Sequence, residues 1–233
     1  MVRQTLIKNV IKGEMADIWN LFTQEEKSEM LTHFEVRSLK KDCTIYKEGE
    51  DSKFLMFLIR GKVKLTKEGV GGRYQIIRLI RPLQYFGFHA YFANIPYTAN
   101  AITLESSIVA FLPMDILESY MYKNSKLSHF FAKQTAGELL YSDNMIVSLT
   151  QKHIRGRLAE SLFRLRDFYG LNDDNTLDAK FSREDLANLS NMTTSNAIRT
   201  LSAFAKEGLI EVNGRNIKII DEERLSKISK FGW

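Results

Sequence analysis

Short runs of hydrophobic residues alternate with polar and turn residues between about positions 34 and 113. Runs such as FEVRSL, KFLMFLIRGKVKLTKEG and SIVAFLP are rich in Ile, Val and Phe, and glycines punctuate the region. Closely spaced short strands of this kind are typical of an antiparallel sandwich or barrel. The GVGGR segment at 69–73 lies between two such runs and opens no helix, so we interpret it as a hairpin turn and not as a phosphate-binding loop. The pattern predicts an antiparallel β-roll.

The spacing of hydrophobic residues becomes helical between about 114 and 149. No proline follows Pro113, and the apolar positions include Leu127, Phe130, Phe131, Leu139, Leu140, Met145, Ile146 and Leu149. These positions fall on more than one side of a helix, so the helix needs two covers. One cover is its own domain, and a second copy of the chain is the natural candidate for the other. A helix buried wholly within one chain is the alternative.

Residues 150–233 are helical again and then end in a hairpin. Ser182 is followed three residues later by Asp185, and Thr193 by Asn196, which predicts two helix starts. A turn of three or four residues separates these short helices, and Asn191 stands where the turn needs a left-handed residue. This spacing is typical of a helix-turn-helix.

A wing follows the second short helix. The strand-like runs GLIEV and NIKII flank Asn213-Gly214, which is a strong signal for a two-residue hairpin. The segment 181–220 therefore predicts a winged helix-turn-helix.

The second short helix presents small polar side chains and one arginine on its first two turns. They are Thr194, Ser195, Asn196 and Arg199. Such groups can reach base edges in a major groove, and Arg199 is the best candidate for a guanine contact. Thr193, Arg183 and the wing would contact phosphates. Double-stranded DNA is therefore the expected partner, and a winged helix that contacts only protein is the alternative.

Composition narrows the class of protein. The 233 residues are 44% hydrophobic and carry a net charge of +5, from 33 basic and 28 acidic residues. This charge permits nucleic-acid binding, but the case for DNA rests on the motif. The longest apolar runs, such as FLMFLI, are far too short to span a bilayer, and the N-terminus has no secretory hydrophobic core, so we expect a cytoplasmic protein with no membrane contact.

Enzyme, metal and cluster chemistry find little support. The sequence has no nucleophile elbow, no HExxH motif and no phosphate loop before a helix, so we expect no enzymatic activity. The single Cys43 excludes an internal disulfide and an iron–sulfur cluster. The other three histidines, His33, His129 and His153, show no spacing typical of a metal site. Haem held by His89, a methionine or Cys43 stays open as an alternative, and no cofactor is expected.

The order of these regions resembles a known superfamily. A β-roll, a long helix, the segment HIRGRLAESLFRL and a winged helix-turn-helix are similar to the cyclic-AMP receptor protein and the fumarate and nitrate reduction regulator. The resemblance runs from about residue 18 onward, and EGE at 48–50, Gly61, GGR at 71–73, Pro82 and Phe86-Gly87 match its turns.

The resemblance implies an α+β protein in three regions. They are an effector domain at 1–124, a cupin-like jelly roll or β-roll with an N-terminal helix; a central dimerisation helix and hinge at 125–150; and a DNA-binding domain at 151–233. It also implies a homodimeric bacterial transcription regulator that binds a near-palindromic operator and has RNA polymerase as a partner. Arg183, Thr194, Ser195 and Arg199 match the positions that touch the operator, and Ser195 stands where a glutamate is frequent.

The segment FGFHAYFANIPYTANA matches the phosphate-binding cassette of nucleotide-binding relatives. In the relatives a glutamate binds the ribose and an arginine pairs with the phosphate, whereas Phe88 and Tyr97 stand here. A buried phosphate without a cation loses a charge-assisted pair, so we expect no response to cyclic AMP. Thr98 and Asn100 can still donate hydrogen bonds, but they carry no charge.

What the cassette binds instead stays open. Phe86, Phe88, Tyr91, Phe92 and Tyr97, with His89 among them, suit an aromatic or lipophilic effector. The alternative is that these rings fill the cavity and no effector binds. On the central helix, Ser142 and Asp143 match positions that contact the nucleotide base in relatives, and an anionic Asp143 argues further against a phosphate ligand.

Overall fold

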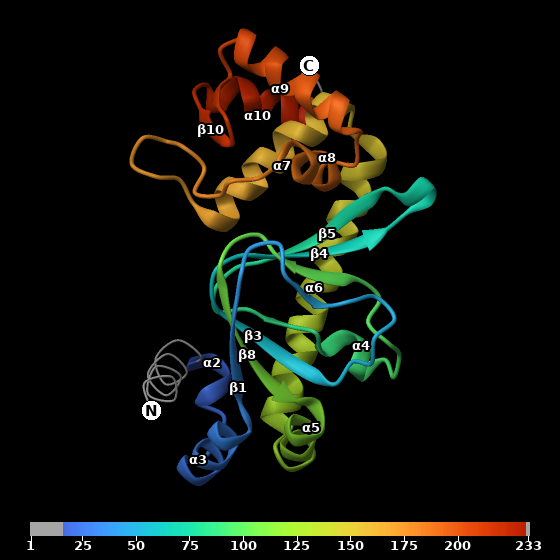
Figure 1. Cartoon of the computed structure of the whole chain (residues 1–233), viewed down its shortest axis with the longest axis vertical. Helices are drawn as coiled ribbons and strands as arrows, with labels where there is room; N and C mark the ends of the chain where they lie inside the picture. The colour runs from blue at the N-terminus through green and yellow to red at the C-terminus, as the bar shows by residue number, and fades with distance from the viewer. Residues whose placement is uncertain (1–15, 232–233) are drawn as a thin grey trace. The chain divides into compact units, whose positions relative to one another are not determined.

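A computed structural model describes residues 16–231 of the chain (Figure 1). The chain forms two compact units, one from the residues up to Lys67 together with Ile77–Leu139, the other from Glu68–Ile76 together with the residues from Leu140 onward. The limits of the three functional regions, at 124 and 150, stay a prediction. Among residues 16–231 no helix is both long enough and apolar enough to cross a membrane.

The first unit opens with two helices. They are α2 (Ala16–Trp19) and α3 (Gln24–His33). A capping box starts α3: the Glu26 backbone N–H donates to Thr23 Oγ1 at 3.2 Å, and the Thr23 N–H donates to the Glu26 carboxylate at 2.8 Å. Two otherwise unpaired donors of the first turn are satisfied in this way.

Two antiparallel four-stranded sheets follow, which confirms the predicted β-roll. In order across the first sheet the strands are β1 (Glu35–Leu39), β8 (Ser107–Pro113), β3 (Phe54–Arg60) and β6 (Tyr85–Phe86). In order across the second they are β2 (Thr44–Tyr46), β7 (Asn100–Thr103), β4 (Val63–Glu68) and β5 (Tyr74–Ile80). The GVGGR segment forms a turn between β4 and β5 that contains a 3-10 helix, η1 (Val70–Gly72). The Gly69 N–H donates to the Arg73 carbonyl at 2.8 Å, so the predicted hairpin turn is confirmed.

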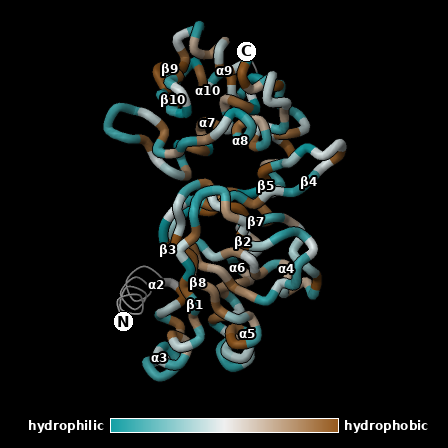
Figure 2. Tube along the Cα trace, viewed as in Figure 1, coloured by the Kyte–Doolittle hydropathy of each residue, from teal (hydrophilic) through white to brown (hydrophobic). Residues whose placement is uncertain are grey.

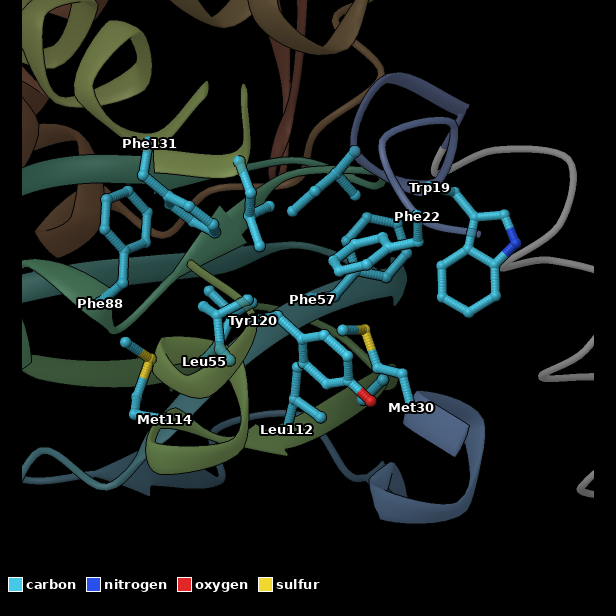
Figure 3. Close-up of a cluster of buried hydrophobic side chains, with 14 residues drawn as sticks. Trp19, Phe22, Met30, Leu55, Phe57, Phe88, Leu112, Met114, Tyr120 and Phe131 are labelled. Carbon is cyan, nitrogen blue, oxygen red and sulfur yellow. The ribbon is translucent and has the colours of Figure 1, made fainter. Parts of the chain in front are cut away.

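Strand β3 shows why the core has two parts. Side chains alternate between the two faces of a strand, and here both faces are buried. Leu55 and Phe57 belong to one buried cluster, whereas Met56 and Leu58 belong to the other. Figure 3 shows the first cluster, in which Phe57 lies among side chains from the N-terminal helices and from the helices after β8. Because neither face meets water, the strand reads as an unbroken apolar run in the sequence.

The long helical pattern after β8 is divided. It forms α5 (Met114–Lys123) and α6 (Ser125–Gln151), with Asn124 in extended conformation between them. The Asn124 side chain donates to the Leu21 carbonyl at 2.8 Å and accepts a bond from the Lys126 backbone N–H at 3.1 Å. These tertiary and capping bonds place the break, which neither a proline nor a glycine marks in the sequence.

The second unit contains the winged helix-turn-helix. Its elements are α7 (Ile154–Tyr169), α8 (Arg183–Leu189), α9 (Thr194–Lys206), β9 (Ile210–Asn213), β10 (Asn216–Ile219) and α10 (Glu222–Phe231). The connector between α7 and α8 is mostly hydrophilic, as Figure 2 shows. Asn213 pairs with Asn216, so the hairpin turn is Gly214-Arg215, one residue later than the predicted Asn213-Gly214. The prediction that the chain ends in this hairpin is wrong, because α10 follows it.

Candidate functional site

Both predicted helix starts of the helix-turn-helix are confirmed. The Asp185 N–H donates to Ser182 Oγ at 3.0 Å, and the Ser182 N–H donates back to the Asp185 carboxylate at 3.1 Å. Thr193 Oγ1 accepts from the Asn196 N–H at 3.2 Å. The turn between α8 and α9 has four residues, and Asn191 adopts the predicted left-handed conformation with φ 50°. Local sequence signals therefore set this motif.

Helix α9 has one buried side and one exposed side. Ala197, Leu201 and Phe204 are almost completely buried. The opposite side carries Thr194, Ser195, Ile198, Arg199 and Ser202, all exposed, with Asn196 half-buried at its edge. The packing of α9 against the rest of its unit thus presents the predicted polar groups to solvent.

Asn196 and Arg199 are linked on the exposed side of α9. Arg199 Nη2 donates to Asn196 Oδ1 at 2.5 Å. A guanidinium carries five N–H donors, so this bond orients the group and leaves donors for a base edge. The two predicted base-contacting residues therefore form one structural unit.

Arg183 at the start of α8 bonds to the wing. Its Nη2 donates to the carbonyl of Gly214, in the hairpin turn, at 2.7 Å. The guanidinium therefore joins the first turn of α8 to the β9–β10 hairpin. Contact of Arg183 with a phosphate stays a prediction, and the bond to Gly214 gives this residue a second role in placing the wing.

Arg157 on α7 was missed by the sequence reasoning. Its guanidinium donates to three backbone carbonyls: Ser190 at 2.9 Å, Asn191 at 3.0 Å and Lys152 at 3.1 Å. Burial lowers the pKa of Arg157 from its usual value. This side chain fixes the turn between α8 and α9 relative to the start of α7. No sequence signal separates it from a surface arginine, because its partners are carbonyls distant in the chain.

In the first unit, the cassette segment forms β6 and the short helix α4 (Phe88–Phe92). Gly87 joins them with φ 88°, and a Cβ at this position would lie 2.1 Å from Met56 Cε and 3.0 Å from the Phe54 carbonyl oxygen. Only glycine fits here. Phe88 points into the core toward Phe131 of α6, with ring centroids 5.2 Å apart (Figure 3).

Tyr97 and its neighbours are also engaged within the β-roll. The Tyr97 ring stacks on Tyr46 with centroids 3.8 Å apart, and its hydroxyl donates to the Phe54 carbonyl at 3.4 Å. Burial raises the pKa of Tyr97 to about 12. The Thr98 carbonyl accepts a bond from Lys67 Nζ at 2.8 Å, and Asn100 Oδ1 accepts one from the Glu48 N–H at 3.0 Å. These groups hold strands and turns together.

A charged cluster lies beside Phe88. The Glu138 carboxylate contacts the Arg78 guanidinium and the His89 ring nitrogen Nε2, so we call this the Arg78–Glu138–His89 cluster. Its members come from β5, α4 and α6 of the first unit. Nε2 of His89 lies against the carboxylate without hydrogen-bond geometry. Burial, together with the charge of Arg78, lowers the pKa of His89 to about 4, so the ring is neutral at pH 7.

The remaining predicted effector residues lie elsewhere. Ser142 and Asp143 are exposed on α6 and belong to the second unit, whereas the cassette residues belong to the first. As for metal chemistry, residues 16–231 hold no group of three or more His, Cys, Asp or Glu side chains that could bind an ion. His89, the predicted haem-ligand alternative, stacks on Phe88 at 4.0 Å between ring centroids.

Helix α6 carries large apolar side chains on both sides, as predicted. Met145 is buried, whereas Leu139, Leu140, Ile146 and Val147 are 63%, 65%, 60% and 51% exposed. At about 100° per residue these four fall on one side of the helix, together with Ala132 and Ala136. We call these six residues the α6 stripe. Nothing in the described part of the chain covers it.

Comparison with known proteins gives matches over both units. The family described as cyclic nucleotide-binding domain matches residues 36–124, and the Crp-like helix-turn-helix domain matches residues 156–228. The chain is 26% identical over 186 residues to a CRP-like cAMP-activated global transcriptional regulator of Mycobacterium tuberculosis, covering 79% of this chain and 83% of that protein. It is 27% identical over 195 residues to the electron transport regulator A of Shewanella oneidensis, covering 83% and 78%.

Solved structures show the same fold. FixK2 from Bradyrhizobium japonicum superposes with a TM-score of 0.75 at 23% identity, covering 83% of this chain and 96% of that one. A putative regulator of the crp/fnr family from Eubacterium rectale gives a TM-score of 0.77 at 18% identity, covering 91% and 97%.

Proposed function

Because this chain belongs to the superfamily of the cyclic-AMP receptor protein and the fumarate and nitrate reduction regulator, and is a transcription regulator of that type, we propose that it binds operator DNA as a homodimer without responding to cyclic AMP. The observation that carries the DNA-binding part is the two-sided helix α9. Its buried side anchors it in the unit, and its exposed side presents Thr194, Ser195 and Arg199. Short polar groups beside an oriented guanidinium match what base edges offer in a major groove.

Supporting contacts fix the register of this helix. Arg157 holds the turn before α9, and Arg183 holds the wing. Thr193 and the wing would contact phosphates, which position the protein without reading sequence. A winged helix that binds only protein would not need an arginine aligned by Asn196 on its outer face, so we favour DNA.

The α6 stripe supports the homodimer. Four large apolar side chains on one exposed helix side are costly in water, and a second copy of the same helix would cover them symmetrically. Paired α6 helices would bring two copies of α9 to successive major grooves, about 34 Å apart, which accounts for a near-palindromic operator. RNA polymerase is the proposed protein partner, and the cytoplasm the proposed location.

The cassette supports independence from cyclic AMP. Phe88 and Tyr97 stand at the two positions that would need a carboxylate and a cation, and both side chains are buried. A cyclic phosphate placed there would lose its charge-assisted pair and would have to displace packed aromatic rings. The Mycobacterium tuberculosis relative is named as cAMP-activated, so this property would separate the two proteins.

A non-nucleotide effector is the second candidate. The Arg78–Glu138–His89 cluster places charged groups next to the rings of Phe88 and Phe92, the two kinds of contact that an aromatic acid needs. Such a ligand, or haem on His89, would have to separate rings that pack against one another, which favours a filled cassette.

The test is selection of bound duplexes from a randomised library by purified, ligand-stripped protein, with and without cyclic AMP. We expect the same near-palindromic site in both arms. Arg199→Ala should relax the recovered sequence more than it lowers non-specific affinity, whereas Lys206→Ala, two turns along α9, should leave the sequence unchanged. A site recovered only with cyclic AMP would overturn the proposed independence, and no site in either arm would favour an effector-dependent protein.

A further inference from the structure

An isoleucine lies in the middle of the polar side of α9. Ile198 is 46% exposed, and its neighbours on that side are Ser195, three residues before it, and Ser202, four residues after it. Residues at these spacings lie next to one another on a helix. Within the described part of the chain, it is the one large hydrophobic side chain exposed on α9.

Packing does not account for this isoleucine. The buried side of α9 is complete with Ala197, Thr200, Leu201 and Phe204, all under 9% exposed. Isoleucine is also a weaker helix former than alanine or leucine, so local propensity does not favour it at a solvent-facing position. A single exposed isoleucine is ordinary on a protein surface. This one stands out because it occupies the centre of the surface that the proposed function places against base edges.

The orientation of Arg199 leaves Ile198 uncovered. At about 100° per residue, Asn196 lies about 60° to one side of Arg199 around the helix, and Ile198 lies about 100° to the other side. The bond from Arg199 Nη2 to Asn196 Oδ1 therefore draws the guanidinium away from Ile198. Arg199 and Ile198 thus address different parts of the groove.

An apolar side chain in a major groove has one apolar partner on the base edges. Guanine, cytosine and adenine present only hydrogen-bonding groups there, whereas thymine also presents a 5-methyl group. We propose that Ile198 is a specificity-determining residue that selects thymine at one position of each half-site by contact with this methyl group. The inference rests on the proposed DNA-binding function and adds to it a residue that reads an apolar feature.

Thymine and uracil differ only in this methyl group, which gives a direct test. Burial of one methyl group corresponds to about 0.8 kcal/mol, or about a fourfold change in affinity. Two half-sites in a dimeric complex would give about a 15-fold change. The duplex recovered by selection is synthesised with each symmetric pair of thymines replaced by uracil in turn, and the dissociation constants are measured by fluorescence anisotropy at fixed salt.

For the wild-type protein we expect about a 15-fold loss at one thymine pair and little change at the others. Ile198→Ala should bind the thymine and uracil duplexes equally at that pair, and Ile198→Val should keep most of the preference. Ile220→Ala is the matched control, because Ile220 is 53% exposed in the same unit but lies outside α9. Far-UV circular dichroism checks that each variant is folded.

The outcomes separate this inference from the proposed function. A wild-type protein that binds its selected site and tolerates uracil everywhere overturns the role of Ile198 alone. A thymine preference that survives in Ile198→Ala assigns the methyl contact to another side chain and also overturns it. Absence of sequence-selective binding by the wild-type protein overturns the proposed function, and this inference with it.

Discussion

The α6 stripe allows the proposed dimer to be tested with a single substitution, Ile146→Ala. Removing three carbons from a fully buried side chain costs about 2.4 kcal/mol at about 0.8 kcal/mol each. Ile146 is 60% exposed in the single chain, so a partner can bury only that fraction, which gives about 1.4 kcal/mol. Both copies of the dimer carry the change, and the total of about 3 kcal/mol weakens dimerisation about 100-fold.

Sedimentation equilibrium over a range of protein concentrations measures this constant. Ile95→Ala is the control, because Ile95 is 44% exposed in the first unit and lies outside α6; we expect it to leave dimerisation unchanged. Folding of both variants is compared by far-UV circular dichroism. Equal dissociation constants for wild type and Ile146→Ala would refute the assignment of the interface to the α6 stripe, and a monomeric wild-type protein at high concentration would refute the dimer.

Three further predictions concern single residues. Arg157→Ala should lower the free energy of unfolding by about 2–3 kcal/mol in urea and should speed amide exchange in the turn between α8 and α9, because three carbonyls lose a charged donor. Gly61→Ala should lower the urea midpoint markedly, since its φ is +102° and a Cβ there would lie 2.7 Å from Ser107 Cα. His89 should titrate near pH 4 by NMR, below the usual 6.5. Because the folded protein then binds fewer protons than the unfolded chain, stability should fall as the pH drops from about 6.5 to about 4.

Each of these has a control and a contrary result. Arg215→Ala removes an exposed arginine and should leave stability unchanged; an equal loss in both variants would show that the Arg157 bonds are weak. Gly49→Ala has a similar left-handed φ of +87° but open space around it, so it should cost only the conformational term of about 1 kcal/mol. A cost for Gly61→Ala no larger than this would mean that Ser107 moves aside. An NMR pKa of His89 above 6.5 would show that the Glu138 carboxylate outweighs burial.

Sequence patterns predicted the two kinds of architecture well where local signals are strong. The caps at Ser182 and Thr193, and the left-handed Asn191, depend on bonds within three residues, so the residues alone specify them. Alternation and turn residues likewise predicted the β-roll. The exact hairpin turn, Gly214-Arg215, differs by one residue because pairing along both strands sets the register.

Other features depend on partners distant in the chain. The break at Asn124 depends on the Leu21 carbonyl, and the cluster beside Phe88 joins Arg78, His89 and Glu138 from three elements. No periodicity or spacing indicates such contacts. Exposure of a residue is decided in the same way, because it depends on what else packs against the element that carries it.

The sequence by itself determined the order of the elements, the helix-turn-helix and its polar helix, and the loss of the charged pair in the cassette, because each follows from residue types at short spacing. Only the tertiary structure decided that Phe88 and Tyr97 are packed within the β-roll, that Arg157 and Arg183 hold the turn and the wing, and that Ile198 stands exposed between serines. The physical reason is that burial and hydrogen-bond partnership belong to pairs of groups. The chain brings most of those pairs together only when it folds.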